Sequence, residues 1–243
     1  MPLERNPSTG ELFLRLPAPY TSLILTPPRP DAPAIQAILR DPAVYTWLGR
    51  PSSNFSFEDA QRLLGEYTAA ANAALDALKD DETEAGALKP MEDCPVRCLR
   101  EVQPDGSDAF VGHIGFKRCK WFELGLDSDT AATRNGEQRE RLVKENDARV
   151  TGDPDIVWQV SYYLSPTHHR RGIMTVVLRT LLDEWAIPRM CMRHIHVSVF
   201  TGNEGSVRML EKCGFVRTGT MERCIEVRGE RRSLHVLDWE RAD

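Results

Sequence analysis

The segment that most constrains the fold is a strand, a turn and a helix between residues 156 and 185. Residues 156–164 (IVWQVSYYL) are rich in β-branched and aromatic side chains, which is typical of a strand. Apolar residues then recur at helical spacing over 172–185 and predict a helix. The turn between them holds Arg170, Arg171 and one glycine. A helix start offers unpaired N–H groups and a positive dipole end, so this turn favours an anion such as phosphate or pyrophosphate.

The other elements predict a mixed α/β sheet. In the same half, a strand is expected at 195–200, a helix at 204–212, and a final hairpin of 215–227 and 232–239. Upstream, strands are expected at 22–26, 96–102 and 109–116, with helices capped by Asp31 and started by Ser56, the second over about 57–78. This order indicates a mixed α/β sheet of about seven strands.

Composition argues against several classes of protein. The formal net charge of −5 over 243 residues does not suit a nucleic-acid partner, whose binding domain is usually basic. No apolar run approaches about 18 residues, so neither a membrane span nor a membrane partner is expected. The six cysteines lack the usual zinc-site spacings and predict reduced, mostly buried thiols, no metal site and a cytoplasmic location.

Residues 123–153 interrupt the pattern of strands and helices. They are polar, highly charged and poor in aromatic side chains, so they cannot bury enough apolar area to form a core. We expect a charged surface insertion, partly mobile, with one short helix around 137–146. The chain as a whole is expected to be a single domain over 1–243.

A second motif occupies residues 203–215 (NEGSVRMLEKCGF). Asn203 follows a predicted strand and can cap the next helix, and Gly214 stands where a left-handed residue commonly ends one. Each residue therefore has a structural explanation. That explanation does not account for their joint occurrence after a turn suited to phosphate.

Together the two segments resemble the acetyl-CoA-binding core of the GNAT N-acetyltransferase superfamily. The first is similar to the motif Gln/Arg-x-x-Gly-x-Gly/Ala, and the second to Asn-x-x-Ser/Ala-x-x-x-Tyr/Leu-x-x-x-Gly-Phe. The Gly-Ile-Met-Thr start and the Leu-Glu-Lys-x-Gly-Phe ending resemble the RimJ/RimL-like branch, particularly its fungal-type members. The close match covers about 155–240. The resemblance implies an α/β fold with a GNAT-like mixed, mostly antiparallel twisted sheet of about seven strands, flanked by helices and with a splayed pair of central strands.

The resemblance also implies a site for acetyl-CoA as co-substrate. The pantetheine would pair with the backbone of Leu164, Asn203 would bind the pantetheine arm, and Ser206 would lie near the thioester sulfur. The pyrophosphate would bind backbone amides of Arg170, Arg171, Gly172, Ile173, Met174 and Thr175.

Three positions depart from the family pattern. His169 stands at the Gln/Arg position, Met174 at the final Gly/Ala position, and Leu210 where many relatives have a tyrosine that acts as general acid. Ser206 is then the best remaining proton donor to the leaving thiolate, or alternatively only a first-turn serine of its helix. The N–H group of Leu164 can polarise the thioester carbonyl.

The sequence leaves the general base open. Many relatives have a glutamate where this chain has Gln159, and an amide cannot accept the proton of an attacking amine. The alternatives are Asp155, His113, His196, Tyr162 and Glu222.

The expected function is acetyl transfer from acetyl-CoA to a primary amine by direct attack in a ternary complex. The acceptor is expected to be a protein N-terminus or a small amine, and the enzyme a monomer or homodimer. One alternative is a non-catalytic acyl-CoA-binding or sensor protein of the same fold, which Gln159 and Leu210 favour. Another is an interaction module that binds phosphate.

Overall fold

The structure is a computed structural model that describes residues 3–49, 54–82, 88–124 and 132–241. The chain divides into two compact units. Unit 1 consists of Met1–Gly115 and Ser161–Met190, and unit 2 of Phe116–Val160 and Cys191–Asp243. The expectation of a single domain stays a prediction.

Unit 1 begins with strands that pair antiparallel, each with the next. Leu14 lies opposite Leu25, and Leu23 lies opposite Glu101. The strands are β1 (Glu4–Arg5), β2 (Leu12–Arg15), β3 (Leu23–Thr26), β4 (Cys98–Val102) and β5 (Asp108–Arg118), the last of which continues into unit 2. The three upstream strands predicted from the sequence correspond to β3, β4 and β5.

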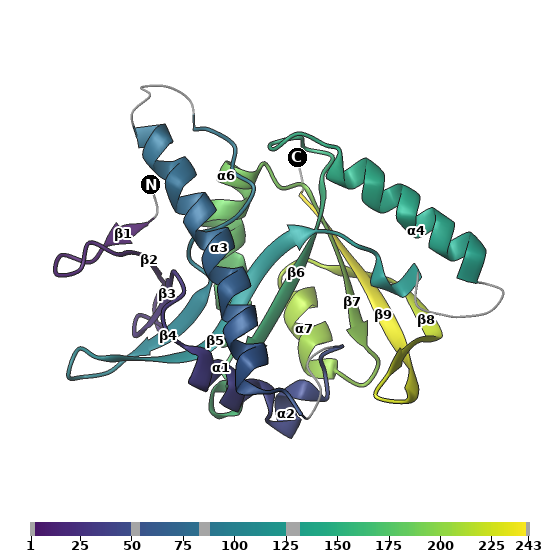
Figure 1. Cartoon of the computed structure of the whole chain (residues 1–243), viewed down its shortest axis with the longest axis horizontal. Helices are drawn as coiled ribbons and strands as arrows, with labels where there is room; N and C mark the ends of the chain where they lie inside the picture. Colours follow the sequence, from purple (N-terminus) through teal and green to yellow (C-terminus); the bar gives the residue numbers. More distant parts are fainter. Residues whose placement is uncertain (1–2, 50–53, 83–87, 125–131, 242–243) are drawn as a thin grey trace. The chain divides into compact units, whose positions relative to one another are not determined.

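The helices of unit 1 enclose an apolar core. Figure 1 shows α1 and α2 beside the first residues of α3, the long blue helix. Ile35 of α1, Ala60 of α3 and Tyr163 belong to one buried cluster. The helices are α1 (Ala32–Leu39), α2 (Pro42–Tyr45), α3 (Phe57–Glu82), α5 (Ile173–Leu181) and α6 (Ile187–Met190), with one π-helical turn, Leu182–Ala186, between the last two.

The two predicted helix starts differ in how they are capped. Ser56 and Asp59 satisfy each other before α3, because the Asp59 N–H donates to Ser56 Oγ at 3.0 Å and the Ser56 N–H donates to Asp59 Oδ2 at 3.0 Å. The prediction that the Asp31 side chain caps α1 is wrong. Its carboxylate instead pairs with Arg100, whose buried guanidinium demands a counter-charge.

Arg100 belongs to a network of five charged side chains in unit 1. Asp108 accepts hydrogen bonds from Arg100 at 3.1 Å and from Arg29 at 2.8 Å. Arg29 also bonds Glu11 at 3.0 Å, and Arg100 bonds Asp31. The network therefore joins two arginines to three carboxylates.

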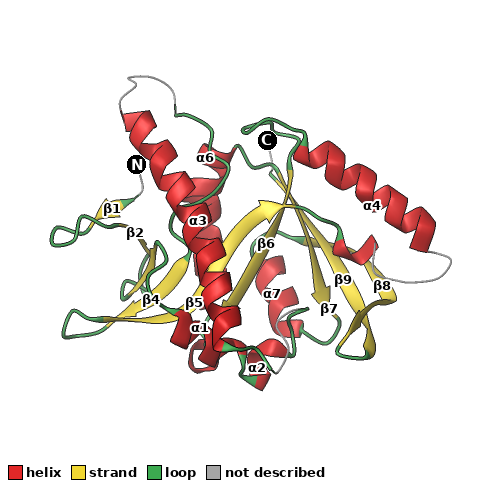
Figure 2. Cartoon of the chain, viewed as in Figure 1, coloured by secondary structure: helices red, strands yellow, loops and turns green. Residues whose placement is uncertain are grey.

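Unit 2 contains one parallel strand pair and a long antiparallel hairpin. Val157 lies opposite His194 and Trp158 opposite Ile195, and the register of this parallel pair ends there, as a splayed pair requires. Figure 2 shows the hairpin of β8 and β9. The elements are β6 (Val157–Leu164, ending in unit 1), β7 (His194–Phe200), α7 (Glu204–Lys212), β8 (Val216–Val227) and β9 (Glu230–Glu240).

The strands form a mixed, mostly antiparallel sheet in the order β1-β2-β3-β4-β5-β6-β7-β9-β8. The fold class predicted from the sequence is therefore correct. The strand number is nine rather than about seven. The two strands that were missed, β1 and β2, have two and four residues, too few to show a clear alternation of apolar and polar side chains.

The region predicted as an insertion contains a short 3₁₀ turn, Phe122–Leu124, and the helix α4 (Ala132–Asp147). This helix has 16 residues and is longer than predicted. Its last turn is tied to unit 2 by Asn146, which is 3% exposed. The Asn146 side chain accepts from the Val157 N–H at 2.9 Å and donates to the Val157 carbonyl at 2.8 Å. Part of the predicted mobile segment, 125–131, lies outside the described residues.

Two smaller expectations concern the membrane and the cysteines. Within the described residues, no helix has both the length and the apolar character of a membrane span. All six cysteines lie in described parts of the chain, where none forms a disulfide; four are buried and two are partly buried, as predicted.

Candidate functional site

The turn that joins β6 to α5 contains two residues in the left-handed region. Arg170 has a φ of 60°, and Gly172, directly before α5, has a φ of 75° and a ψ of 0°. Left-handed residues in a turn can gather successive N–H groups on one side and so form an anion-binding concavity. The start of α5 adds N–H groups without an acceptor inside the helix, and the positive end of its dipole. The turn therefore fits a phosphate or pyrophosphate group.

The backbone of this turn is accessible. Arg170, Arg171 and Gly172 are exposed, whereas Met174 is 8% exposed, so the Met174 side chain is buried. A Cβ atom on Gly172 would lie 3.1 Å from the Tyr20 hydroxyl, so a side chain here would be crowded as well as strained. These features suit a ligand that contacts the backbone. Ile173, which is buried, and Thr175, which is partly buried, complete the first turn of α5.

Leu164 ends β6, and its peptide bond to Ser165 is held at both ends. The Leu164 carbonyl accepts from His169 Nε2 at 2.8 Å, and the Ser165 N–H donates to the Val111 carbonyl at 2.7 Å. His169, at the position of the family's Gln/Arg, thus bonds the backbone at the end of β6.

Gly112 is a residue that the sequence reasoning missed. A Cβ atom there would lie 2.6 Å from the carbonyl oxygen of Tyr163, so only glycine lets β5 approach the end of β6 this closely. The available signal was a glycine inside a predicted strand, which often marks close approach of a second backbone.

In unit 2, Asn203 and Ser206 meet at the start of α7. The Ser206 N–H donates to Asn203 Oδ1 at 3.3 Å, so the predicted cap by Asn203 is confirmed. Gly214 follows the helix with a φ of 91°, the left-handed conformation predicted for it. Within the described part of the chain, the Ser206 hydroxyl has no hydrogen-bond partner, and the residue is partly exposed.

The two positions where relatives hold an acid or a base carry neither here. Leu210 is fully buried in the core. Gln159 accepts a hydrogen bond from the Lys120 N–H at 3.0 Å through its side-chain oxygen. A hydrocarbon side chain and a carboxamide cannot exchange protons with an amine or a thiol near neutral pH.

His196 lies between two carboxylates. Its Nδ1 is 2.6 Å from Asp238, and its Nε2 is 2.7 Å from Glu123, which is 5% exposed. Burial alone would lower the pKa of His196, but its hydrogen bonds to Asp238 and Glu123 raise that pKa to about 9. The ring is therefore protonated on both nitrogens at neutral pH and cannot accept another proton. This environment disfavours His196 as the general base.

Glu123 was not singled out in the sequence, because it lies in the segment predicted as an exposed insertion. The Ser198 hydroxyl donates to its second oxygen at 3.2 Å. Burial alone would raise the pKa of Glu123, but the hydrogen bond from His196 and the cationic charge of that ring lower it below the usual range. The only local signal was its place between the apolar residues Phe122 and Leu124.

The other base alternatives occupy different environments. His113 is 3% exposed and stacks on Tyr67 with 3.7 Å between ring centroids, so it belongs to the core of unit 1. Asp155 is exposed and lies 3.4 Å from Arg149. Glu222, also exposed, accepts from the Ser233 hydroxyl at 2.7 Å. Tyr162 is partly buried.

The structure brings the predicted site residues together as two groups. Leu164 and residues 170–175 share the turn in unit 1, whereas Asn203 and Ser206 share the start of α7 in unit 2.

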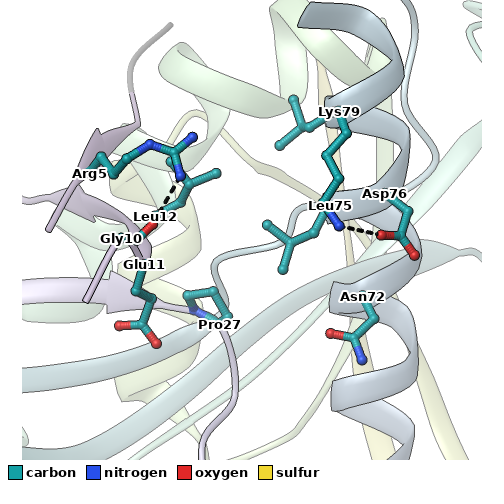
Figure 3. Close-up of a pocket in the computed structure, with 10 residues that line it drawn as sticks. Arg5, Gly10, Glu11, Leu12, Pro27, Asn72, Leu75, Asp76 and Lys79 are labelled. Atoms are coloured by element: carbon teal, nitrogen blue, oxygen red, sulfur yellow. Dashed lines mark hydrogen bonds and ion pairs between the residues drawn. The ribbon is translucent and has the colours of Figure 1, made fainter.

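A separate pocket of about 540 Å³ lies in unit 1, beside α3. Figure 3 shows residues from the β1–β2 region on one side and Asn72, Asp76 and Lys79 of α3 on the other. Asp76 pairs with Lys79 at 2.9 Å, and Arg5 donates to the Gly10 carbonyl at 3.0 Å. The pocket contains none of the predicted site residues.

Comparisons with known proteins point to one family. A family model described as an acetyltransferase (GNAT) domain matches residues 22–216. The Bacillus subtilis protein named "Probable N-acetyltransferase YjcK" is 33% identical over 70 residues, which make up 29% of this chain and 38% of that protein. The match thus spans well under half the length of this relative.

Solved structures share the fold. A GNAT-family acetyltransferase from Bacillus anthracis has a TM-score of 0.59 at 14% identity, covering 94% of this chain and 98% of that one. RimJ of Mycobacterium smegmatis, in complex with CoA-disulfide, has a TM-score of 0.55 at 19% identity, covering 94% of this chain and 85% of that one.

Proposed function

The chain belongs to the GNAT acetyltransferase family, and on this premise we propose that it transfers acetyl from acetyl-CoA to a primary amine by direct attack in a ternary complex. The observation that carries the proposal is the turn before α5. Its left-handed Arg170 and Gly172, its exposed arginines and the helix start match the doubly charged pyrophosphate of acetyl-CoA.

In the proposed reaction, the neutral amine nitrogen attacks the thioester carbonyl carbon. The Leu164 N–H stabilises the negative charge that develops on the carbonyl oxygen. The carbon–sulfur bond then breaks, the thiolate takes a proton from the Ser206 hydroxyl, and water returns a proton to the Ser206 oxygen. The proton lost by the amine passes to water or to a base. The products are the amide and CoA.

The Asn203 side chain can bind the pantetheine arm through its nitrogen, Nδ2. Its Oδ1 caps α7, which leaves the two N–H bonds of Nδ2 as donors to a carbonyl of the pantetheine arm. The cap also fixes the side chain, so its donors are oriented before the ligand arrives.

A non-catalytic acyl-CoA-binding protein of the same fold is the second candidate. The observation that favours it is that neither Gln159 nor Leu210 can exchange a proton. Gln159 accepts a hydrogen bond from the Lys120 N–H, and Leu210 is buried in the core. The partly exposed Ser206 hydroxyl favours the enzyme.

We propose that the acceptor is a protein N-terminus or a small amine, and that the enzyme is a monomer or a homodimer. The name of the Bacillus subtilis relative, an N-acetyltransferase, supports a nitrogen nucleophile. A panel of peptides, polyamines, amino acids and amino sugars, with free CoA thiol as the readout, tests the proposal. Release of CoA that depends on one acceptor class supports the enzyme, whereas tight acetyl-CoA binding without release from any acceptor supports the second candidate.

Gly172→Glu tests where acetyl-CoA binds. The carboxylate would place negative charge and bulk in the turn, so we expect calorimetry to detect no acetyl-CoA binding. Gly106→Glu is the matched control, because Gly106 also has a positive φ, 85°, but nothing lies within 4 Å of its Cβ position. Unchanged acetyl-CoA affinity in Gly172→Glu would show that the turn is not the binding site.

A further inference from the structure

The turn before α5 is held by two side chains that come from far upstream in the sequence. The Tyr20 hydroxyl donates to the Arg171 carbonyl at 2.6 Å. On the other flank, Nε2 of His168 lies 3.2 Å from Glu101 Oε2, and Nδ1 of the same ring bonds the Thr167 hydroxyl at 2.8 Å. All of these residues belong to unit 1.

The bond from Tyr20 determines where the next N–H group points. Arg171 C=O and Gly172 N–H belong to the same peptide unit, which is planar, and in a trans unit the two bonds point in opposite directions. Because the carbonyl faces the Tyr20 hydroxyl, the Gly172 N–H faces away from it. A rotated peptide would lose this hydrogen bond and turn its carbonyl oxygen toward any anion bound by the turn.

Such rotation would otherwise be easy at this position. Gly172 follows the peptide, and a glycine at a φ of 75° can adopt many other conformations at low cost. Nothing on the glycine itself selects one orientation. The hydroxyl of Tyr20 supplies that selection.

Tyr20 is itself fixed by two turns in the connection between β2 and β3. Its N–H donates to the Pro17 carbonyl at 2.9 Å, and its carbonyl accepts from the Leu23 N–H at 2.9 Å. Leu23 begins β3 and lies opposite Glu101 of β4. Glu101 therefore lies at the end of the β3–β4 ladder where β3 begins, and Tyr20 lies in the connection that leads into that end.

We propose that Tyr20 is a positioning residue for acetyl-CoA: its hydroxyl holds the Arg171–Gly172 peptide so that the Gly172 N–H faces the pyrophosphate. This inference rests on the proposed function, because it assumes that the turn binds acetyl-CoA. Tyr20 acts through the backbone and has no part in the bonds that form and break.

The test is Tyr20→Phe, which removes the hydroxyl and keeps the ring. Loss of one hydrogen bond in the binding-competent turn should raise the Kd and KM for acetyl-CoA about 3- to 10-fold, with kcat changed less than twofold. S-acetylpantetheine lacks the pyrophosphate, so its KM should stay the same. Thr68→Val is a matched control, because it removes a hydroxyl that donates to a backbone carbonyl, that of Leu64, at 2.8 Å.

Each other outcome overturns the inference in a recognisable way. Equal acetyl-CoA affinity in Tyr20→Phe and the parent chain shows that the hydroxyl does not position the turn. An equal rise in KM for acetyl-CoA and S-acetylpantetheine, or a similar loss in Thr68→Val, shows a general effect on the fold. A parent chain that binds no acetyl-CoA removes the proposed function itself, which the other outcomes leave in place.

Discussion

At the scale of single residues, the Ser206 hydroxyl is the group on which the proposed proton transfer depends. Asn203 caps α7, so the backbone N–H of Ser206 is satisfied while its hydroxyl has no partner within the described residues. Ser206 lies in the first turn of α7, as the structural alternative weighed from the sequence requires, but the side chain that caps the helix is that of Asn203.

Ser206→Ala should therefore lower kcat about 10- to 1000-fold and leave acetyl-CoA affinity nearly unchanged. The lower bound is small because the CoA thiol, with an ordinary pKa near 8.5, is a fair leaving group without help. The free energy of unfolding should change by less than about 0.5 kcal/mol. Steady-state kinetics and chemical denaturation on the same preparation measure both, and Ser206→Thr, which keeps a hydroxyl, should retain more activity. An unchanged kcat in Ser206→Ala would assign the proton to solvent.

The site residues that could be predicted are those with a local motif. Asn203 and Gly214 follow rules for helix ends that involve only nearby residues, and the structure shows both in their predicted roles. Glu123 could not be found this way, because its partner His196 is distant in sequence and their contact depends on the fold. The role of Tyr20 is hidden for the same reason.

At the scale of elements, the ends of a helix or strand were predictable where a capping residue or a glycine marks them. Helix α7 has the predicted bounds, since a cap and a glycine mark its two ends. The predicted helix was shorter than α4 because the sequence of α4 contains few apolar residues to mark its ends. The contacts that anchor α4 are tertiary, such as the bond from Asn146 to Val157.

Asn146→Ala tests how α4 is anchored. The change removes two hydrogen bonds to Val157 and leaves the Val157 N–H without its acceptor, so we expect a loss of about 2–3 kcal/mol in the free energy of unfolding. Urea denaturation measures this loss. Gln138→Ala, at an exposed position of the same helix, should change stability by less than about 0.5 kcal/mol. Equal effects of the two changes would contradict an anchoring role for Asn146.

At the scale of the whole molecule, the His196 cluster makes stability depend on pH. The pKa of His196 is about 9 in the folded chain, and its ordinary value is 6.5. The contribution of His196 to stability is therefore complete below pH 6.5 and is lost as pH rises through 9. The pKa values of Glu123 and Asp238 are lowered, so their contribution is present above their ordinary values and is lost in acid. A stability plateau is expected between about pH 5 and 6.5.

Denaturation at pH 6 and pH 9.5 tests this linkage. Between these pH values, the free energy of unfolding of the parent chain should fall by up to about 3 kcal/mol more than that of His196→Gln, because the variant lacks the titrating ring. Parallel pH profiles for the two proteins would mean that His196 is not protonated in the folded state. The chemical shift of the His196 ring in an NMR titration gives an independent reading.

The five-member network of Glu11, Arg29, Asp31, Arg100 and Asp108 has a consequence for natural variation. Asp108 bonds two arginines at once, and loss of either arginine leaves a carboxylate, Glu11 or Asp31, without its cationic partner in the network. Removing one partner of a buried pair costs about 3–5 kcal/mol, whereas replacing the whole set with apolar residues can be nearly neutral. Evolution should therefore exchange these positions as a block, and sequences of relatives are expected to show them co-varying across two strands, the start of α1 and the segments next to β2 and β3.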